Sequence, residues 1–353
     1  MSVRVLIVDD SALMRALLQN RLEREHDITV VGAAADAAEA RQLIKALDPD
    51  VVTLDIEMPG MDGLSFLAKI MQLRPTPVIL VSGATEAGAS ATARGLQLGA
   101  IGCIAKSQLR MAPGARDDGA LVAMVREAAR SRHGPTQNRP PPPMAPIAIS
   151  RPTAPLPDLI VIGASTGGVE ALHTLLAGFP ADCPPTVIVQ HINGCFAGAI
   201  AQSFDRAIAP RVMLAESDMP LDRGMVLLAP GNERHLQIAA AGSRGFRCVL
   251  REGDPVAGHR PSVDRLFSSL AATLGAARGD RGLGILLTGM GQDGAQGMVQ
   301  LASIGARTIA QDQASCVVFG MPRAAIELGA AGEVLPLADI APAIFAPAKA
   351  AAS

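Results

Sequence analysis

Short apolar runs alternate with amphipathic stretches through the N-terminal part of the chain. The amphipathic stretches include residues 12–25 and 37–46. The apolar runs that they separate lie at residues 3–8, 51–54, 78–81 and 101–105. A strand buried on both faces carries a near-continuous apolar run, and a helix that covers it has one apolar face. The pattern therefore predicts an α/β fold, in which helices cover both sides of a parallel sheet.

The C-terminal part of the chain shows the same alternation. Its short apolar runs lie at residues 159–162, 187–189, 225–228, 285–287 and 308–310. No fixed-period repeat is present, which argues against a solenoid or a propeller. We therefore expect a second α/β domain with a doubly wound, mainly parallel sheet.

A proline-rich stretch separates the two parts. Prolines crowd residues 134–157, where large apolar residues are few. Proline lacks an amide donor and disfavours helix in the residue before it, so this stretch cannot form regular helix or a central strand. A semi-rigid spacer and a disordered tether both remain open. The predicted organisation is a domain at residues 1–131, a linker at 132–157 and a domain at 158–346.

Composition narrows the function classes. Lys and Arg total 31 against 33 Asp and Glu, a formal net charge of −2 that argues against whole-chain binding to nucleic acid or an anionic membrane. The chain has no Trp, no Tyr and 8 Phe. Aromatic side chains are therefore too few for extensive stacking on nucleic-acid bases or for an aromatic belt at a membrane interface. Acids at Asp9 and Asp10 follow the first apolar run at once, so neither a signal peptide nor membrane insertion is expected. The five cysteines lack CxxC spacing, which indicates reduced thiols in a cytoplasmic protein.

Polar residues stand at the carboxyl ends of the N-terminal strands. Asp9 and Asp10 follow the apolar run at 3–8, Asp55 follows the run at 51–54, and Ser82 and Lys106 follow the last two. Parallel strands end at one edge of a sheet, where three carboxylates would repel one another unless a hard cation such as Mg²⁺ lay among them. The lysine and the hydroxyl would complete a cradle for a phosphoryl group. Helix capping or surface exposure explains each residue singly, but not all five together.

A serine stands in a glycine-rich turn after the first C-terminal strand. The run Gly163-Ala164-Ser165-Thr166-Gly167-Gly168 leads into a predicted helix at residues 169–177. Three interpretations fit this run: a nucleophile elbow of the GxSxG type, a dinucleotide-binding turn, and a turn whose glycines serve packing alone. For a dinucleotide turn, Ser165 replaces a glycine and Gly168 comes one position early. The motif by itself does not decide among the three.

Two further residues offer partners for this serine. His191 comes directly after the next strand, and Asp293 lies in a glycine-rich loop after a later one. Each alone is explained as a core histidine or a helix cap, but with Ser165 they supply a nucleophile, a base and an orienting acid at one sheet edge. The order Ser, His, Asp differs from that of α/β-hydrolases. The α/β-hydrolase order stays possible with Ser165, an acid such as Asp254, and His259, the last histidine of the chain.

The N-terminal part resembles the response-regulator receiver domain. The resemblance rests on residues 5–11, 55–63, 81–82 and 98–100 and on Lys106. It implies that Asp55 is the phosphoryl acceptor and that Ser82 and Lys106 contact the phosphoryl oxygens. The Mg²⁺ ligands that it implies are Asp10, Asp55, the backbone carbonyl of Glu57 and, directly or through water, Asp9.

The C-terminal part resembles the catalytic domain of the chemotaxis protein-glutamate methylesterases of the CheB type. The matching segments are residues 162–168, 189–191, 229–231, 259–264, 287–295, 310–312 and 315–322. By this resemblance Ser165 is the nucleophile, His191 the general base and Asp293 the residue that orients His191. Thr166 and Met290 would lie near the reacting centre.

Some positions depart from the two family patterns. Cys103 stands where receivers usually carry an aromatic switch residue, and Ser107 replaces a proline. After His191, the family usually continues Met-Pro-Pro-x-Phe, whereas this chain has Ile192-Asn193-Gly194-Cys195-Phe196. The departures concern switching and substrate fit rather than the predicted triad.

Together the resemblances imply a flavodoxin-like receiver domain joined to a doubly wound esterase domain. The implied enzyme is activated by phosphorylation, removes methyl esters from chemoreceptor glutamates with release of methanol, and deamidates receptor glutamines. It would need Mg²⁺ for receiver phosphorylation and no cofactor for ester hydrolysis. Its implied partners are methyl-accepting chemoreceptors and a chemotaxis histidine kinase, and the unmodified receiver is expected to cover the esterase site.

Other function classes stay open at this stage. A transcriptional regulator is disfavoured because the C-terminal part has no basic recognition helix. A nucleotide-binding domain that uses residues 163–168 is a second alternative. A third is a regulator that binds receptors with altered hydrolysis or none, which the unusual loop after His191 suggests.

Overall fold

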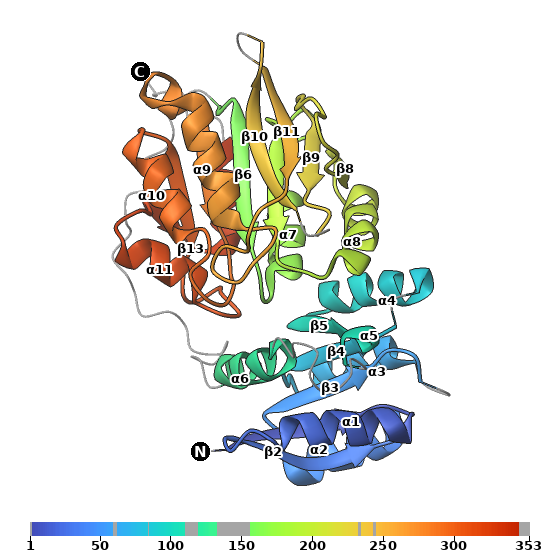
Figure 1. Cartoon of the computed structure of the whole chain (residues 1–353). Coiled ribbons are helices and arrows are strands. Elements are labelled where there is room, and N and C mark those ends of the chain that lie inside the picture. Colours follow the sequence, from blue (N-terminus) through green and yellow to red (C-terminus); the bar gives the residue numbers. More distant parts are fainter. Residues whose placement is uncertain are drawn as a thin grey trace, which may run out of the picture. The chain divides into compact units, whose positions relative to one another are not determined.

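The computed structural model describes residues 2–58, 62–83, 85–109, 119–132, 156–231, 234–242 and 245–345 (Figure 1). The chain separates into two compact units, with the division between Thr136 and Gln137. The predicted linker at 132–157 lies almost entirely outside the described residues. Among the described residues, no helix has the length and apolar character needed to cross a membrane.

The first unit is a parallel sheet flanked by helices. Its strands are β1 (Val3–Val8), β2 (Ile28–Ala34), β3 (Val51–Asp55), β4 (Val78–Ser82) and β5 (Gly102–Ala105). Its helices are α1 (Ala12–Leu22), α2 (Ala37–Leu47), α3 (Gly63–Leu73), α4 (Glu86–Gln97), α5 (Lys106–Leu109) and α6 (Ala120–Arg132). The strand order β2-β1-β3-β4-β5 is that of the flavodoxin-like folds, so the predicted fold class is confirmed.

Local sequence sets the helix boundaries of the first unit. Ser11, Asp36, Asp62 and Thr85 cap α1 to α4 in turn, each with a side-chain oxygen that accepts a hydrogen bond from a first-turn amide. Every residue of β3 and β4 is buried, as expected for strands covered on both faces. The sheet therefore carries the polar residues at its carboxyl edge on a rigid base.

The second unit is built on a larger sheet. Its parallel strands are β6 (Leu159–Ala164), β7 (Thr186–Gln190), β8 (Arg211–Leu214), β9 (Met225–Leu228), β12 (Gly282–Leu286), β13 (Arg307–Gln311) and β14 (Glu333–Leu335). Its helices are α7 (Gly168–Leu176), α8 (Gly194–Ala207), α9 (Val263–Leu274), α10 (Ala295–Ser303), α11 (Met321–Glu327) and α12 (Leu337–Phe345), with a 3₁₀ turn at Ala276–Arg281. An antiparallel hairpin, β10 (His235–Ala241) and β11 (Gly245–Arg251), stands apart from the sheet. The apolar pattern did not predict this hairpin.

The strand order places β6 where the chain reverses direction across the sheet. The order is β14-β13-β12-β6-β7-β9-β8, so β7 and β12 lie on opposite sides of β6. In the view of Figure 1, α9 and α10 lie in front of the sheet and α7 behind it. In open parallel sheets, the carboxyl ends of strands at such a switch point form a crevice for ligands. The doubly wound architecture is confirmed. The residues that follow β6, β7 and β12 are therefore the candidates for a functional site.

Candidate active site

Ser165 directly follows β6 and is fixed through its backbone. Its amide donates to the carbonyl of Thr288 at 3.0 Å, and its carbonyl accepts from the amide of Gly168 at 2.8 Å. A side chain at Gly289 would place a Cβ only 2.6 Å from Cβ of Ser165, so this position tolerates only glycine. The turn holds the serine at the start of α7, beside the loop that follows β12.

His191 and Asp293 come together at the same edge. His191 follows β7, Asp293 lies between β12 and α10, and His191 Nε2 is 2.8 Å from Asp293 Oδ2. Asp293 is fully buried, and the His191 side chain is only 8% exposed. His191 Nδ1 is also buried and has no hydrogen-bond partner among the residues that the structure describes. Because the acid binds Nε2, Nδ1 is the nitrogen free to act as a base.

The Asp293 carboxylate is held by the start of α9. Ser262 Oγ donates to Oδ1 at 2.8 Å, and the amides of Val263 and Asp264 donate at 2.8 Å to Oδ2 and 3.0 Å to Oδ1. Amides at a helix start also bring the positive end of the helix dipole to this carboxylate. Burial alone would raise the pKa of Asp293, but the hydrogen bonds from His191 and from the α9 amides outweigh it and hold that pKa below its ordinary value. The acid is therefore ionised at neutral pH, and the histidine donates its Nε2 proton to it.

A second histidine packs on the first. The rings of His259 and His191 are stacked, with their centroids 3.8 Å apart and their planes 7° from parallel. Burial and the neighbouring His191 lower the pKa of His259 to about 4. His259 is therefore neutral at pH 7, and its flat ring restricts His191 without adding a charge beside it.

Gln190, the last residue of β7, joins the serine turn to the histidine. Its Nε2 donates to the carbonyl of Ser165 at 2.8 Å and to the carbonyl of His191 at 3.1 Å. Gln190 is buried, so both bonds are shielded from water. The Gln190 side chain thus holds the backbone of both Ser165 and His191, the predicted nucleophile and its predicted base.

The structure places the remaining predicted residues as follows. Thr166 comes next to the serine, with its carbonyl held by Thr288 Oγ1 at 3.0 Å, and Met290 is half-buried after Gly289. Ser165 Oγ and His191 have no direct hydrogen bond in the described part of the chain; such bonds are often long before substrate binds. The alternative that pairs Asp254 with His259 gains no support, because His259 stacks on His191 and has no hydrogen bond to the Asp254 carboxylate among the described residues.

Sequence reasoning left three contributors without a role. Gln190 and His259 were quoted within matching segments, but only the folded strand ends show what they touch. Ser262, in the same segment as His259, both caps α9 and binds Asp293. Its signal was present as a serine just before an apolar, helix-like run, the usual mark of a helix start. In the loop after His191, Asn193 caps α8.

The first unit gathers its own polar residues at the carboxyl edge of its sheet. Lys106 Nζ lies 2.7 Å from Asp55 Oδ2 and 3.3 Å from Asp9 Oδ2. Oxygen atoms of Asp9, Asp10 and Asp55 all lie within 4.8 Å of one another. The Ser82 hydroxyl donates to the carbonyls of Gly83 and Gly88, each at 3.3 Å, rather than to a carboxylate.

The charges at this edge fit a divalent cation. Burial and the charge of Asp55 raise the pKa of Asp9, and Asp9 Oδ2 is a buried atom without a well-aligned donor among the described residues. Burial lowers the pKa of Lys106, but its bond to Asp55 and the two aspartate charges outweigh this and raise it. One ammonium thus faces three carboxylates, and oxygen donors of this kind are those that Mg²⁺ prefers. Glu57 donates its amide to Asp55 Oδ1 at 3.1 Å; residues 59–61 of the same motif lie outside the described residues.

The comparisons with known proteins agree with these two arrangements. In the second unit, Ser165 and the His191–Asp293 pair follow neighbouring strands, and in the first unit Asp9, Asp10, Asp55 and Lys106 gather at the sheet edge. The family model described as CheB methylesterase matches residues 160–344, and the response regulator receiver domain model matches residues 5–111. The chain belongs to the CheB methylesterase family, with a receiver domain at its N-terminal end.

Relatives of this chain match it along most of its length. It is 48% identical over 344 residues to a protein-glutamate methylesterase/protein-glutamine glutaminase 1 of Caulobacter vibrioides, covering 97% of each chain. It is 49% identical over 347 residues to a protein of the same description from Agrobacterium fabrum, covering 96% of this chain and 94% of that one. The crystal structure of the Thermotoga maritima CheB methylesterase catalytic domain matches with a TM-score of 0.50 at 33% identity, over 53% of this chain and 97% of that one.

The stacked His259 predicts a pH dependence of stability. Its pKa is about 4 in the folded chain against an ordinary 6.5, so the unfolded chain binds more protons between these values. We expect the free energy of unfolding to fall as the pH drops from about 6.5 toward 4. His259→Phe keeps a flat ring but cannot be protonated, so the fall between pH 7 and pH 5 should be smaller in this variant. Urea unfolding at pH 7 and pH 5 measures the fall in the free energy of unfolding. An equal fall in the unaltered chain and in His259→Phe would contradict the lowered pKa of His259.

Proposed function

We propose that this chain hydrolyses methyl esters of glutamate side chains in chemoreceptors and deamidates receptor glutamines, under the control of its receiver domain. The membership of the CheB methylesterase family supports the reaction class. The observation that carries the proposal is the buried pair of His191 and Asp293 beside the serine turn, because it supplies a base where an ester carbonyl needs an activated hydroxyl.

The proposed reaction has two steps. His191 Nδ1 takes the proton of Ser165 Oγ, which attacks the γ-carbonyl carbon of the methyl ester. The C–O bond to the methoxy group then breaks, His191 returns the proton, and methanol leaves. In the second step His191 takes a proton from water, the hydroxide attacks the acyl-enzyme, and Ser165 regains its proton as glutamate departs. Asp293 stays ionised and stabilises the imidazolium in both steps.

The oxyanion of each tetrahedral intermediate needs donors in fixed positions. We assign this role to backbone amides at the start of α7, next to Ser165, because helix N-terminal amides point toward negative charge. Loss of one such donor typically lowers kcat about 10²–10³-fold. Glutamine follows the same route with ammonia as the leaving group, and the ester chemistry draws on protein side chains and backbone alone.

In the receiver domain, we assign Asp55 as the phosphoryl acceptor and a chemotaxis histidine kinase as the donor. The carboxylates of Asp9, Asp10 and Asp55 and the carbonyl of Glu57 would hold Mg²⁺. The ion, when bound, supplies charge neutralisation between donor and acceptor. Lys106 already contacts Asp55 and would pair with a phosphoryl oxygen, and Ser82 would reach another once its hydroxyl turns from the loop carbonyls.

Phosphorylation would control the esterase by changing how the two units associate. A phosphoryl group adds close to two negative charges at the carboxyl edge of the receiver sheet. In our proposal the unmodified receiver restricts access to Ser165, and phosphorylation relieves the restriction. To move such an equilibrium from 1:99 to 99:1 takes about 5.5 kcal/mol, which requires reorganisation of a whole contact surface rather than of one ion pair.

Removal of the nucleophile tests the chemistry. Ser165→Ala should lower methanol release from methylated receptor membranes by a factor on the order of 10⁴ or more, since no other group can form the acyl-enzyme. Ser303→Ala, which removes an exposed hydroxyl on α10, is the matched control and should keep full activity. Near-normal turnover by Ser165→Ala would refute the assigned nucleophile. Absence of turnover in the unaltered chain would favour a receptor-binding regulator without hydrolysis.

Removal of the phosphoryl acceptor tests the regulation. With Mg²⁺ and a small-molecule phosphoryl donor, methanol release by the full chain should rise about tenfold or more, whereas Asp55→Asn should show no rise. Asp62→Asn makes the same carboxylate-to-amide change at the exposed cap of α3 and should respond like the unaltered chain. Initial rates with and without the donor provide the measurement. An equal rise in Asp55→Asn would exclude Asp55 as the control point.

A further inference from the structure

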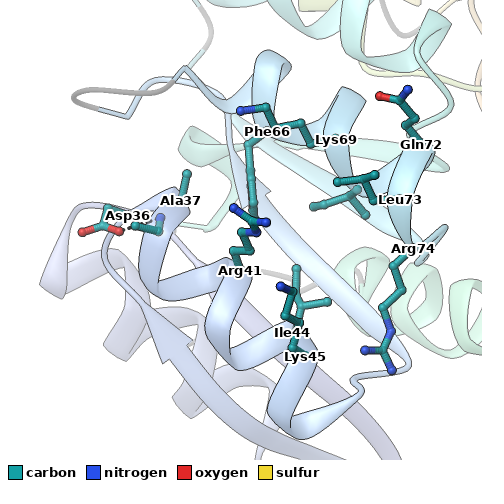
Figure 2. A pocket seen from close by; sticks show the side chains of 12 residues that line it. Asp36, Ala37, Arg41, Ile44, Lys45, Phe66, Lys69, Gln72, Leu73 and Arg74 are labelled. Atoms are coloured by element: carbon teal, nitrogen blue, oxygen red, sulfur yellow. Dashed lines mark hydrogen bonds between the residues drawn. The ribbon is translucent and has the colours of Figure 1, made fainter.

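A groove runs between α2 and α3 on the receiver domain and shares no residue with either site described above. It encloses about 1020 Å³. Figure 2 shows side chains from both helices around one open space. The residues that line it are Asp36, Ala37, Ala38, Arg41, Ile44 and Lys45 on the α2 side and Phe66, Lys69, Ile70, Gln72, Leu73 and Arg74 on the α3 side.

The floor of the groove is apolar. Phe66, Ile70 and Leu73 follow the i, i+4, i+7 spacing of one helix face on α3, and Ile44 faces them from α2. Phe66, Ile70 and Ile44 are buried, but the Leu73 side chain is 70% exposed at the open side. An exposed apolar side chain beside an apolar groove is an arrangement that can bind an apolar side chain of a partner.

The rim of the groove is cationic. Arg41 and Lys45 stand one helical turn apart on α2, both exposed, and neither forms an ion pair with another described residue. Lys69 and Arg74 stand on the α3 side, and Arg74 pairs with Asp48 at 2.7 Å. Asp36 is the one acid in the lining, and one of its carboxylate oxygens accepts bonds from the amides of Ala38 and Glu39. The rim therefore carries a net positive charge, with Arg41 and Lys45 as its cations that lack an acidic partner among the described residues.

We propose that this groove is a docking site for an acidic amphipathic segment of a partner protein. Apolar side chains of the segment would enter the space over Phe66 and Ile70 and cover Leu73. Carboxylates beside them would pair with Arg41 and Lys45. This is helix-in-groove or short-peptide recognition, in which apolar anchors supply affinity and charge complementarity selects the partner.

The surroundings disfavour other occupants. The chain's own proline-rich stretch at 133–157 and its last residues, 346–353, contain no Asp or Glu, so neither matches the cationic rim. Phe66 is the one aromatic side chain in the lining, so successive bases of a nucleic acid would find no row of rings to stack on. Leu73 is the only exposed large apolar side chain in the lining, which is too little apolar surface for insertion into a membrane. A protein segment that combines apolar and acidic side chains fits both features.

Fluorescence anisotropy with designed peptides tests the proposal. The probe is a labelled peptide of about four helical turns with Leu at i, i+4 and i+7 and Glu on both flanks. A second peptide has Gln for Glu, and a third has Ser for Leu. The full chain should bind the first peptide saturably and the other two at least about tenfold more weakly. The variant Arg41→Glu/Lys45→Glu should also lose about tenfold or more, whereas Arg24→Glu/Arg94→Glu, the same charge change at exposed sites outside the groove, should bind within about twofold.

A second variant guards against a folding defect. Leu73→Ser alters an exposed residue and should weaken the first peptide several-fold while circular dichroism and methanol release stay unchanged. The proposal is overturned if Arg41→Glu/Lys45→Glu binds the first peptide like the unaltered chain, or if the Ser peptide binds as tightly as the Leu peptide. It is also overturned if no peptide binds below about 1 mM, or if single-stranded DNA or anionic vesicles compete at the same site with higher affinity. Because hydrolysis is measured separately, failure of the groove leaves the proposed function untouched.

Discussion

The buried carboxylate of Asp293 is the group on which the catalytic half of the structure depends. An ionised acid without exposure to water is costly unless donors surround it. Here those donors come from His191, from the Ser262 hydroxyl and from two amides at the start of α9. The same bonds that keep the acid ionised fix the helix start, the loop after β12 and the tautomer of His191. Stability and chemical competence therefore rest on one set of hydrogen bonds.

The segment from His259 to Asp264 contacts both the Asp293 carboxylate and the His191 ring. Its first residue stacks on the His191 ring, and its last three contact Asp293. Gln190 adds a third constraint by holding the backbone of both Ser165 and His191. The receiver meets a similar problem differently: its carboxylates have one lysine and a shortage of donors, which leaves room for a cation and a phosphoryl group. The protein itself supplies the hydrogen-bond donors to Asp293, whereas Lys106 is the one ammonium beside the receiver carboxylates among the described residues.

Much of this arrangement could be predicted from the sequence because parallel strands bring their carboxyl ends to a common edge. The pattern of apolar runs located β1, β3, β4, β6 and β7, and with them the neighbourhoods of Asp55, Ser165 and His191. The pairing of His191 with Asp293 followed from the same rule once both residues were placed after strands. The catalytic roles themselves remain predictions.

Other features depend on side-chain geometry that no local pattern encodes. The stacking of His259 and the two bonds from Gln190 require the folded loops. The hairpin of β10 and β11 escaped prediction because Gln237 interrupts the apolar positions of β10 and Arg247 interrupts those of β11. The α2–α3 groove arises from two helices whose separate sequences show only ordinary amphipathic faces.

The central claim is that Asp293 fixes His191 with its proton on Nε2 and leaves Nδ1 as the base. Nitrogen NMR of the full chain labelled at histidine reads this directly at pH 7. We expect the His191 signal, identified by its loss in His191→Gln, to show a protonated Nε2 and an unprotonated Nδ1, and we expect Asp293→Asn to disturb this state. A His191 signal with the proton on Nδ1 in the unaltered chain would overturn the assignment of Nδ1 as the base.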